Sequence, residues 1–67
     1  MRVEDQYRGR AYVEYTVYDI PNNPKVSDDF LIGYVFGKLD DDPTRFFGYH
    51  IHRWPMTTTA TVTLHTD

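Results

Sequence analysis

The three histidines are the residues whose type and spacing most directly suggest chemistry. His50 and His52 are two residues apart, so on a β-strand both imidazoles would project from the same face. With His65 they would supply the three ligands of a catalytic zinc site. The expected strand pairing places His65 opposite Phe46, four residues from His50, which is about 13 Å at the rise of a strand. We therefore expect no metal site within one chain, and only a two-histidine site shared between two copies stays open. Otherwise these are surface histidines that contact Tyr34 and a row of threonines.

The remaining side chains give little basis for catalysis. The chain has no cysteine, and its only serine, Ser27, has no evident base nearby in the sequence. The acidic residues form two groups, Asp28-Asp29 and Asp40-Asp41-Asp42, which we expect at opposite ends of one strand. Carboxylates that far apart cannot act as an acid–base pair, and their ordinary role is to stop strands and solvate turns. We expect no enzyme and no cofactor.

Length and composition limit the architecture. A chain of 67 residues has room for one domain, residues 1–67, with a small core and a thin margin of stability. It has no cysteine for a disulfide, but 16% of its residues are aromatic, and large rings bury much area each. A partner subunit could supply part of the core.

Charge and hydropathy suggest location and partner class. The net charge of −3 argues against a broad electrostatic grip on nucleic-acid phosphates. Residues 1–5 carry charges where a signal peptide would be apolar, and the longest apolar stretch, Phe30–Phe36, is too short to span a bilayer. We therefore expect a cytoplasmic protein with no membrane partner.

Four segments are rich in β-branched and aromatic residues and are bounded by turn formers, which predicts strands. Residues 1–9 could form an arm, a short helix or an extra strand. The predicted strands are Arg10–Ile20, Phe30–Leu39, Arg45–Trp54 and Thr58–Thr66.

Hairpins between consecutive strands predict one apolar face. With a loop at residues 40–44, the glycines of Phe30–Leu39 and Arg45–Trp54 lie opposite bulky residues, an arrangement that stabilises glycine in a sheet. In Thr58–Thr66 the even positions from Ala60 to Leu64 are apolar and the odd positions are mostly threonine. A four-residue turn, 54–57, would place Ala60 beside Ile51 and Val62 beside Tyr49. The expected inward residues are Ala11, Val13, Tyr15, Val17, Leu31, Val35, Leu39, Phe47, Tyr49, Ile51, Ala60, Val62 and Leu64.

This pattern predicts an all-β fold, a four- to five-stranded antiparallel meander. A single sheet would leave its apolar face uncovered, since no segment shows helical periodicity over several turns. We expect the sheet to curl into a small SH3-like or OB-like barrel, or to be completed by homodimerisation.

The opposite face of the predicted sheet is more apolar than an idle solvent face, which indicates a second core or a docking surface. Its expected binding residues are Tyr34, Phe36, Lys38, Phe46, His50, His52 and Trp54. We expect a small non-catalytic protein that binds another protein through this face. Its role could be that of an adaptor, or of an inhibitor of the phage or mobile-element kind that blocks a host enzyme or defence complex.

Two further possibilities use the same sheet. The exposed aromatics could stack the bases of a single-stranded nucleic acid, although no RNA-binding or cold-shock motif is present. Alternatively, Thr58–Thr66 carries no charge before His65, so as an edge strand it would offer free backbone groups through Thr59, Thr61 and Thr63. The competing expectation is that this strand pairs with Arg10–Ile20 and closes a barrel.

Overall fold

In the computed structural model, residues 1–22, 25–38 and 45–66 are described. Over these described residues the chain is mostly β, with four antiparallel strands in one open sheet and one helix. In the described residues, no helix has the length and apolar character that crossing a membrane requires. In chain order the elements are β1 (Arg2–Arg8), β2 (Tyr12–Tyr18), α1 (Asp28–Lys38), β3 (Gly48–Arg53) and β4 (Ala60–His65).

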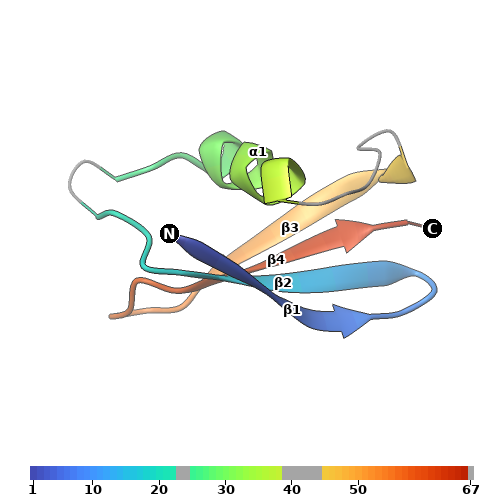
Figure 1. The fold of residues 1–67 in the computed structure, drawn as a ribbon, viewed down its shortest axis with the longest axis horizontal. Coiled ribbons are helices and arrows are strands. Elements are labelled where there is room, and N and C mark those ends of the chain that lie inside the picture. Colours follow the sequence, from blue (N-terminus) through green and yellow to red (C-terminus); the bar gives the residue numbers. More distant parts are fainter. Residues whose placement is uncertain (23–24, 39–44, 67) are drawn as a thin grey trace.

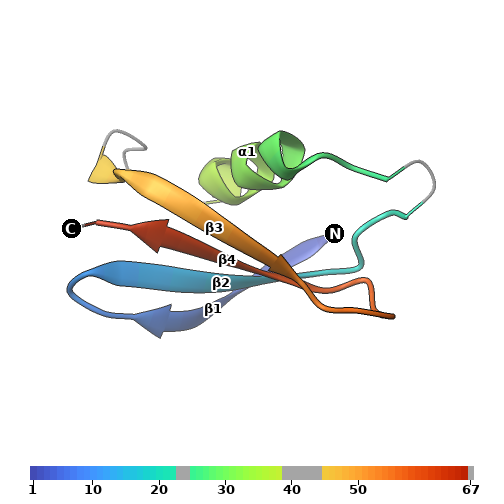
Figure 2. The same cartoon turned by 180° about the vertical axis from the view of Figure 1, so that it is seen from behind.

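The order of strands across the sheet is β1-β2-β4-β3, and every neighbouring pair is antiparallel. Two hairpins, β1–β2 and β3–β4, are joined by α1, and β4 lies between β2 and β3 as in a split β-α-β unit. Figures 1 and 2 show α1 on one side of the sheet and no helix or strand of the described residues on the other. The predicted meander is therefore wrong, and closure into an SH3-like or OB-like barrel is not seen among the described residues.

The segment predicted as the strand Phe30–Leu39 is a helix instead. Ser27 caps it: its backbone carbonyl accepts from the N–H of Leu31 at 3.2 Å and its hydroxyl accepts from the N–H of Phe30 at 3.1 Å. Asp28 and Asp29 in the first turn and Lys38 in the last turn complement the helix dipole. The predicted pairing of glycines with bulky residues, and the hairpin that it implied, are therefore wrong because they required this strand. Residues 39–44 themselves lie outside the described part of the chain.

The helix completes a two-layer core. Its buried residues Leu31, Ile32 and Val35 are spaced as on one helical face, and they pack on the inner side of β2 and β4. The strands contribute Val13, Tyr15, Val17, Ala60, Val62 and Leu64, all at most 6% exposed. Of the residues predicted to point inward, Ala11, Phe47 and Tyr49 are exposed. Because α1 covers the core face of the sheet, no second subunit is needed to bury it.

The β3–β4 hairpin has the predicted sidedness with a different register. Ile51 pairs with Val62 and Tyr49 with Leu64, two residues away from the predicted pairs. The loop keeps the predicted four residues but lies one residue further along the chain, because the last pair is Trp54 with Thr59, joined by an N–H···O bond of 3.0 Å. A shift of two residues preserves which face each side chain occupies.

Among the alternatives for residues 1–9, the structure selects an edge strand. Arg2 pairs with Tyr18 and Arg8 with Val13, with an irregularity between Asp5 and Tyr7 that places an extra residue in β1. The Arg8 guanidinium donates to the Tyr15 hydroxyl at 3.0 Å, which fixes the far end of β1 to the core side of β2.

Replacing Gly33 or Gly37 by alanine should stabilise the protein. Both glycines lie in α1, both are exposed, and a Cβ added at either would meet nothing within 4 Å. Because glycine is the weaker helix former, each substitution should raise the free energy of unfolding by about 0.5–1 kcal/mol. Urea denaturation followed by circular dichroism measures this change.

Ser27→Ala is the matched change of opposite sign. It removes the cap and should lower the free energy of unfolding by about 1 kcal/mol. If Gly33→Ala and Gly37→Ala destabilise the chain while Ser27→Ala has no effect, residues 28–38 do not form this helix.

Candidate functional site: the open face of the sheet

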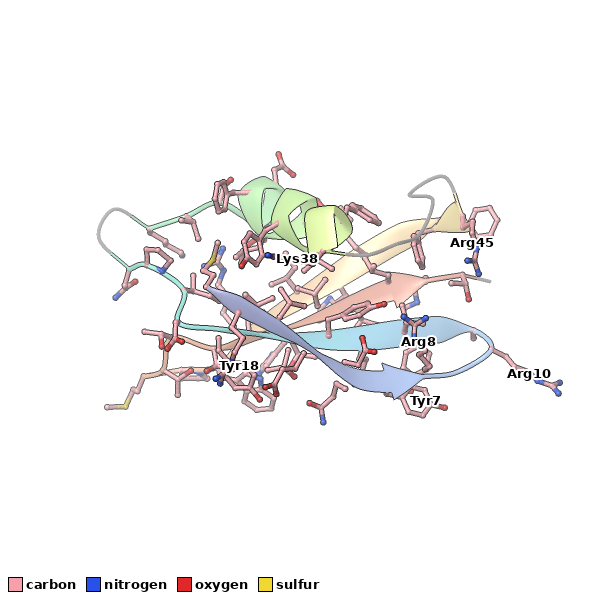
Figure 3. All side chains as sticks on the ribbon, viewed as in Figure 1. Tyr7, Arg8, Arg10, Tyr18, Lys38 and Arg45 are labelled. Atoms are coloured by element: carbon pink, nitrogen blue, oxygen red, sulfur yellow. The ribbon has the colours of Figure 1, made fainter. Side chains whose placement is uncertain are left out.

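The side of the sheet opposite α1 is here called the open face. Figure 3 shows Tyr7 and Tyr18 pointing away from α1, whereas Lys38 lies beside the helix. Alternation along the strands and the pairing register assign the other members of this face. They are Arg2, Glu4, Gln6, Tyr7, Tyr12, Glu14, Thr16, Tyr18, His50, His52, Trp54, Thr61, Thr63 and His65.

Trp54 is held in one orientation at one end of the open face. Its indole N–H donates to the Thr61 hydroxyl at 3.0 Å, and the His52 ring meets it edge-on with centroids 4.3 Å apart. Nevertheless 48% of Trp54 is exposed. A large ring that is fixed and half exposed would lose little side-chain freedom on contact with another surface.

The middle of the open face is polar. A shallow trough of 590 Å³ runs over it, lined by side chains from all four strands and by Trp54. Thr16 is 7% exposed and donates its hydroxyl proton to Gln6 Oε1 at 2.7 Å. Glu14, Thr63 and His50 follow one another across β2, β4 and β3 because Thr63 pairs with both. These groups can accept and donate hydrogen bonds to a ligand surface.

Aromatic rings continue along the other strands. The rings of Tyr7 and Tyr12 lie 5.2 Å apart, and those of Tyr12 and His65 lie 6.4 Å apart, so three strands carry one row of rings. At the end near Trp54, the Arg2 guanidinium lies 4.5 Å from the centroid of the Tyr18 ring, a cation–π contact. The polar middle is thus bordered by aromatic rings at both ends.

The open face carries little formal charge. Its charged residues are Arg2, Glu4 and Glu14, one arginine against two glutamates when the histidines are neutral. Arg2 is also engaged by Tyr18 and lies 3.7 Å from Glu4. This face has no cationic stripe that could neutralise a series of phosphates.

The predicted binding residues divide between two layers. His50, His52 and Trp54 lie on the open face. Tyr34, Phe36 and Lys38 lie on α1, where the Tyr34 hydroxyl donates to the Met1 carbonyl at 2.7 Å. Phe36 and Phe46 pack against the edge of the core with their rings 5.7 Å apart. The single aromatic surface expected from the sequence is therefore wrong, because it depended on a strand at Phe30–Leu39.

The predicted strand-edge contact is also wrong, whereas the competing expectation that Thr58–Thr66 pairs with Arg10–Ile20 is confirmed, because β4 pairs with β2. β4 lies between β2 and β3, so the backbone of Thr61 and Thr63 is paired on both sides. The side chains of Thr61 and Thr63 still lie on the open face, and Thr59 lies where the adjoining β3–β4 loop meets β4. The edges of the sheet are β1 and β3.

Alternation along the sequence predicts the β2 residues of this face but not those of β1. Tyr12, Glu14, Thr16 and Tyr18 alternate with apolar residues, which gave the signal. Residues 2–8 are polar and irregular, and only the Gly9-Arg10 pair before β2 marks a hairpin. The bond from Gly9 N–H to the Tyr12 carbonyl, 2.9 Å, closes that hairpin.

Metal-ligating side chains do not converge within the described ranges: no three histidine, aspartate or glutamate residues there are grouped closely enough to hold an ion. Comparison with known proteins found no matching family model, no matching curated protein and no matching solved structure. The geometry of the open face is therefore what carries the functional argument.

The loop between β3 and β4 adds a second exposed apolar group. Met56 is fully exposed and has φ = 59°, a left-handed conformation that glycine adopts without strain. It follows Pro55, and the Thr57 hydroxyl donates to the Trp54 carbonyl at 2.8 Å across this turn. A large, exposed apolar side chain thus stands at a loop position whose backbone conformation favours glycine.

Met56→Gly should therefore raise the free energy of unfolding by about 0.5–1 kcal/mol, because it relieves a left-handed conformation and loses no buried side chain. Chemical denaturation measures the change. The matched variant is Asp19→Gly, since Asp19 has φ = 57° but aspartate tolerates this region better. If Asp19→Gly raises the free energy of unfolding as much as Met56→Gly or more, the left-handed conformation does not cost Met56 more than it costs Asp19.

Proposed function

We propose that the protein is a non-catalytic binding protein that contacts another protein through its open face. The observation that carries this proposal is the asymmetry of the sheet: α1 buries one face, and the other presents Trp54 half exposed in a fixed position. Binding energy at protein interfaces concentrates in such tryptophan, tyrosine and arginine anchors.

The surrounding residue types support a protein partner. Tyrosine rings offer apolar area with a polar tip, and threonine hydroxyls around the trough can pair with backbone groups of a partner. The low formal charge of the face favours a partner surface that is largely neutral, with hydrogen-bonding groups around a pocket for the indole of Trp54.

The mode of action we infer is occupation of a surface. The effect on a partner would then come from covering it or joining it to something else. An adaptor and an inhibitor of an enzyme or defence complex both fit this mode. The choice of an inhibitor of the phage or mobile-element kind rests on analogy with other small proteins.

Trp54→Ala should weaken binding to the partner by about 30-fold or more, the effect of losing an anchor worth about 2 kcal/mol. The partner is obtained by cross-linking capture from the source cells with the wild-type chain. Its affinity for the purified variants is then measured by calorimetry.

The control is Phe30→Ala, which removes another aromatic side chain of similar exposure, 52%, from the helix layer. It should retain the wild-type affinity. If Trp54→Ala folds and binds as tightly as wild type while Phe30→Ala loses binding, the partner contacts the helix layer and the proposal is wrong.

A second candidate function rests on the row formed by Tyr7, Tyr12 and His65. Rings that follow one another across an exposed sheet can stack the bases of a single-stranded nucleic acid. The scarcity of cationic groups on the same face counts against it, since phosphate contacts supply much of such affinity.

Titration of labelled single-stranded oligonucleotides at low and high salt separates the two functions. We expect no saturable binding at low salt. Tight binding that salt weakens, and that Tyr12→Ala abolishes, would replace the protein-partner proposal with the nucleic-acid one.

A further inference from the structure

The two edges of the sheet differ in how they meet a neighbouring strand. β1 carries Arg2, Glu4, Asp5 and Arg8 and has a register irregularity, features that protect an edge from pairing. β3 has one formal charge, Arg53 at its end, and within the described residues it pairs only with β4. Phe47, next to β3, is 80% exposed and Tyr49 is 49% exposed. The unprotected edge is therefore β3.

The backbone groups on that edge can be assigned. Trp54 N–H donates to the Thr59 carbonyl, so Trp54, and by alternation His52 and His50, direct their backbone groups toward β4. The N–H and carbonyl groups of Tyr49, Ile51 and Arg53 then point outward. Their side chains lie on the core face, which leaves both histidines on the open face.

We propose that β3 pairs antiparallel with β3 of a second copy of this chain, about a two-fold axis at Ile51, and that the pairing creates a four-histidine site for a divalent transition metal such as Zn²⁺. The outward groups of Ile51 would bond those of Ile51 in the second copy, and Tyr49 would pair with Arg53 of the second copy. Arg53 would thus meet a tyrosine and not another arginine, so the edge is complementary to itself in charge.

The histidines follow from this register. His50 would lie directly opposite His52 of the second copy, and the reverse pair would follow by symmetry. These are non-hydrogen-bonded positions, with Cα atoms about 4.5 Å apart across the strands and about 6.6 Å apart along each strand. Four imidazoles on one face at that spacing can converge on a tetrahedral Zn²⁺ at about 2.0–2.1 Å, whereas one chain provides only two ligands.

The pairing is tested with the intact protein by analytical ultracentrifugation, with and without Zn²⁺ and after addition of a chelator. With Zn²⁺ the sedimenting mass should double from the 7.9 kDa chain mass, with one Zn²⁺ bound for every two chains. The His52 ring contacts Trp54, the only tryptophan, so Zn²⁺ should also change the tryptophan emission. Amide hydrogen exchange should slow at Tyr49, Ile51 and Arg53.

His50→Ala and His52→Ala are exposed substitutions and should each weaken the zinc-dependent association by more than about tenfold. His65→Ala is the matched control, because His65 is also exposed on the open face but lies on β4; it should associate as wild type does.

Three outcomes would overturn the proposal. The first is a monomer at every concentration with Zn²⁺ present, including one that binds Zn²⁺ one to one. The second is a zinc-dependent dimer that persists in His50→Ala. The third is protection of the Tyr49, Ile51 and Arg53 amides only when an extended segment of another protein is bound, which would assign the β3 edge to that partner.

Discussion

The packing of α1 on one face of the sheet is the interaction on which the rest of the structure depends. Leu31 and Val35 are fully buried against a layer that includes Val17, Val62 and Leu64. In so short a chain this contact between layers supplies apolar burial that offsets the loss of conformational entropy. One helix covers one face only, so the same contact leaves the open face without a cover. The fixed Trp54 and the polar trough are exposed because the chain has no second helix among its described residues to place over them.

The sidedness of β2, β3 and β4 could be predicted because it rests on a period of two. Val13 and Val62 alternate with Glu14 and Thr63, and this alternation holds whichever strands are neighbours. The register was not predictable in the same way, since it depends on where the β3–β4 loop lies, and this loop begins at Pro55 and not at Trp54. Burial of one face tolerates a shift of two residues but not of one. The histidines and Trp54 were therefore assigned to the correct face despite the wrong pairs.

The helix was missed because its sequence gives conflicting signals. Gly33 and Gly37 are weak helix formers, and the aromatic and β-branched residues around them favour a strand. The contrary signals were Ser27, the acidic first turn and the helical spacing of Leu31, Ile32 and Val35. Tertiary packing resolves the conflict, because a helix here buries the face of β2 and β4. This one error moved Tyr34, Phe36 and Lys38 to the wrong layer and left β4 at an edge of the expected meander unless the sheet closed into a barrel. Propensity alone could not order the strands, since their order depends on the crossover that α1 makes.

The position of β4 has a consequence for how the chain reaches its final form. The strand nearest the C-terminus lies in the interior of the sheet, between β2 and β3, and its neighbour β2 lies far away in the sequence. During synthesis the β1–β2 hairpin and α1 emerge first. Until β4 adds Val62 and Leu64, however, α1 can pack only on the apolar residues of β2. Loss of the final strand would remove the centre of the sheet and separate its two edges. The protein should therefore fold cooperatively as one unit once β4 is available. It should not fold by adding strands one at a time to the edge of a sheet.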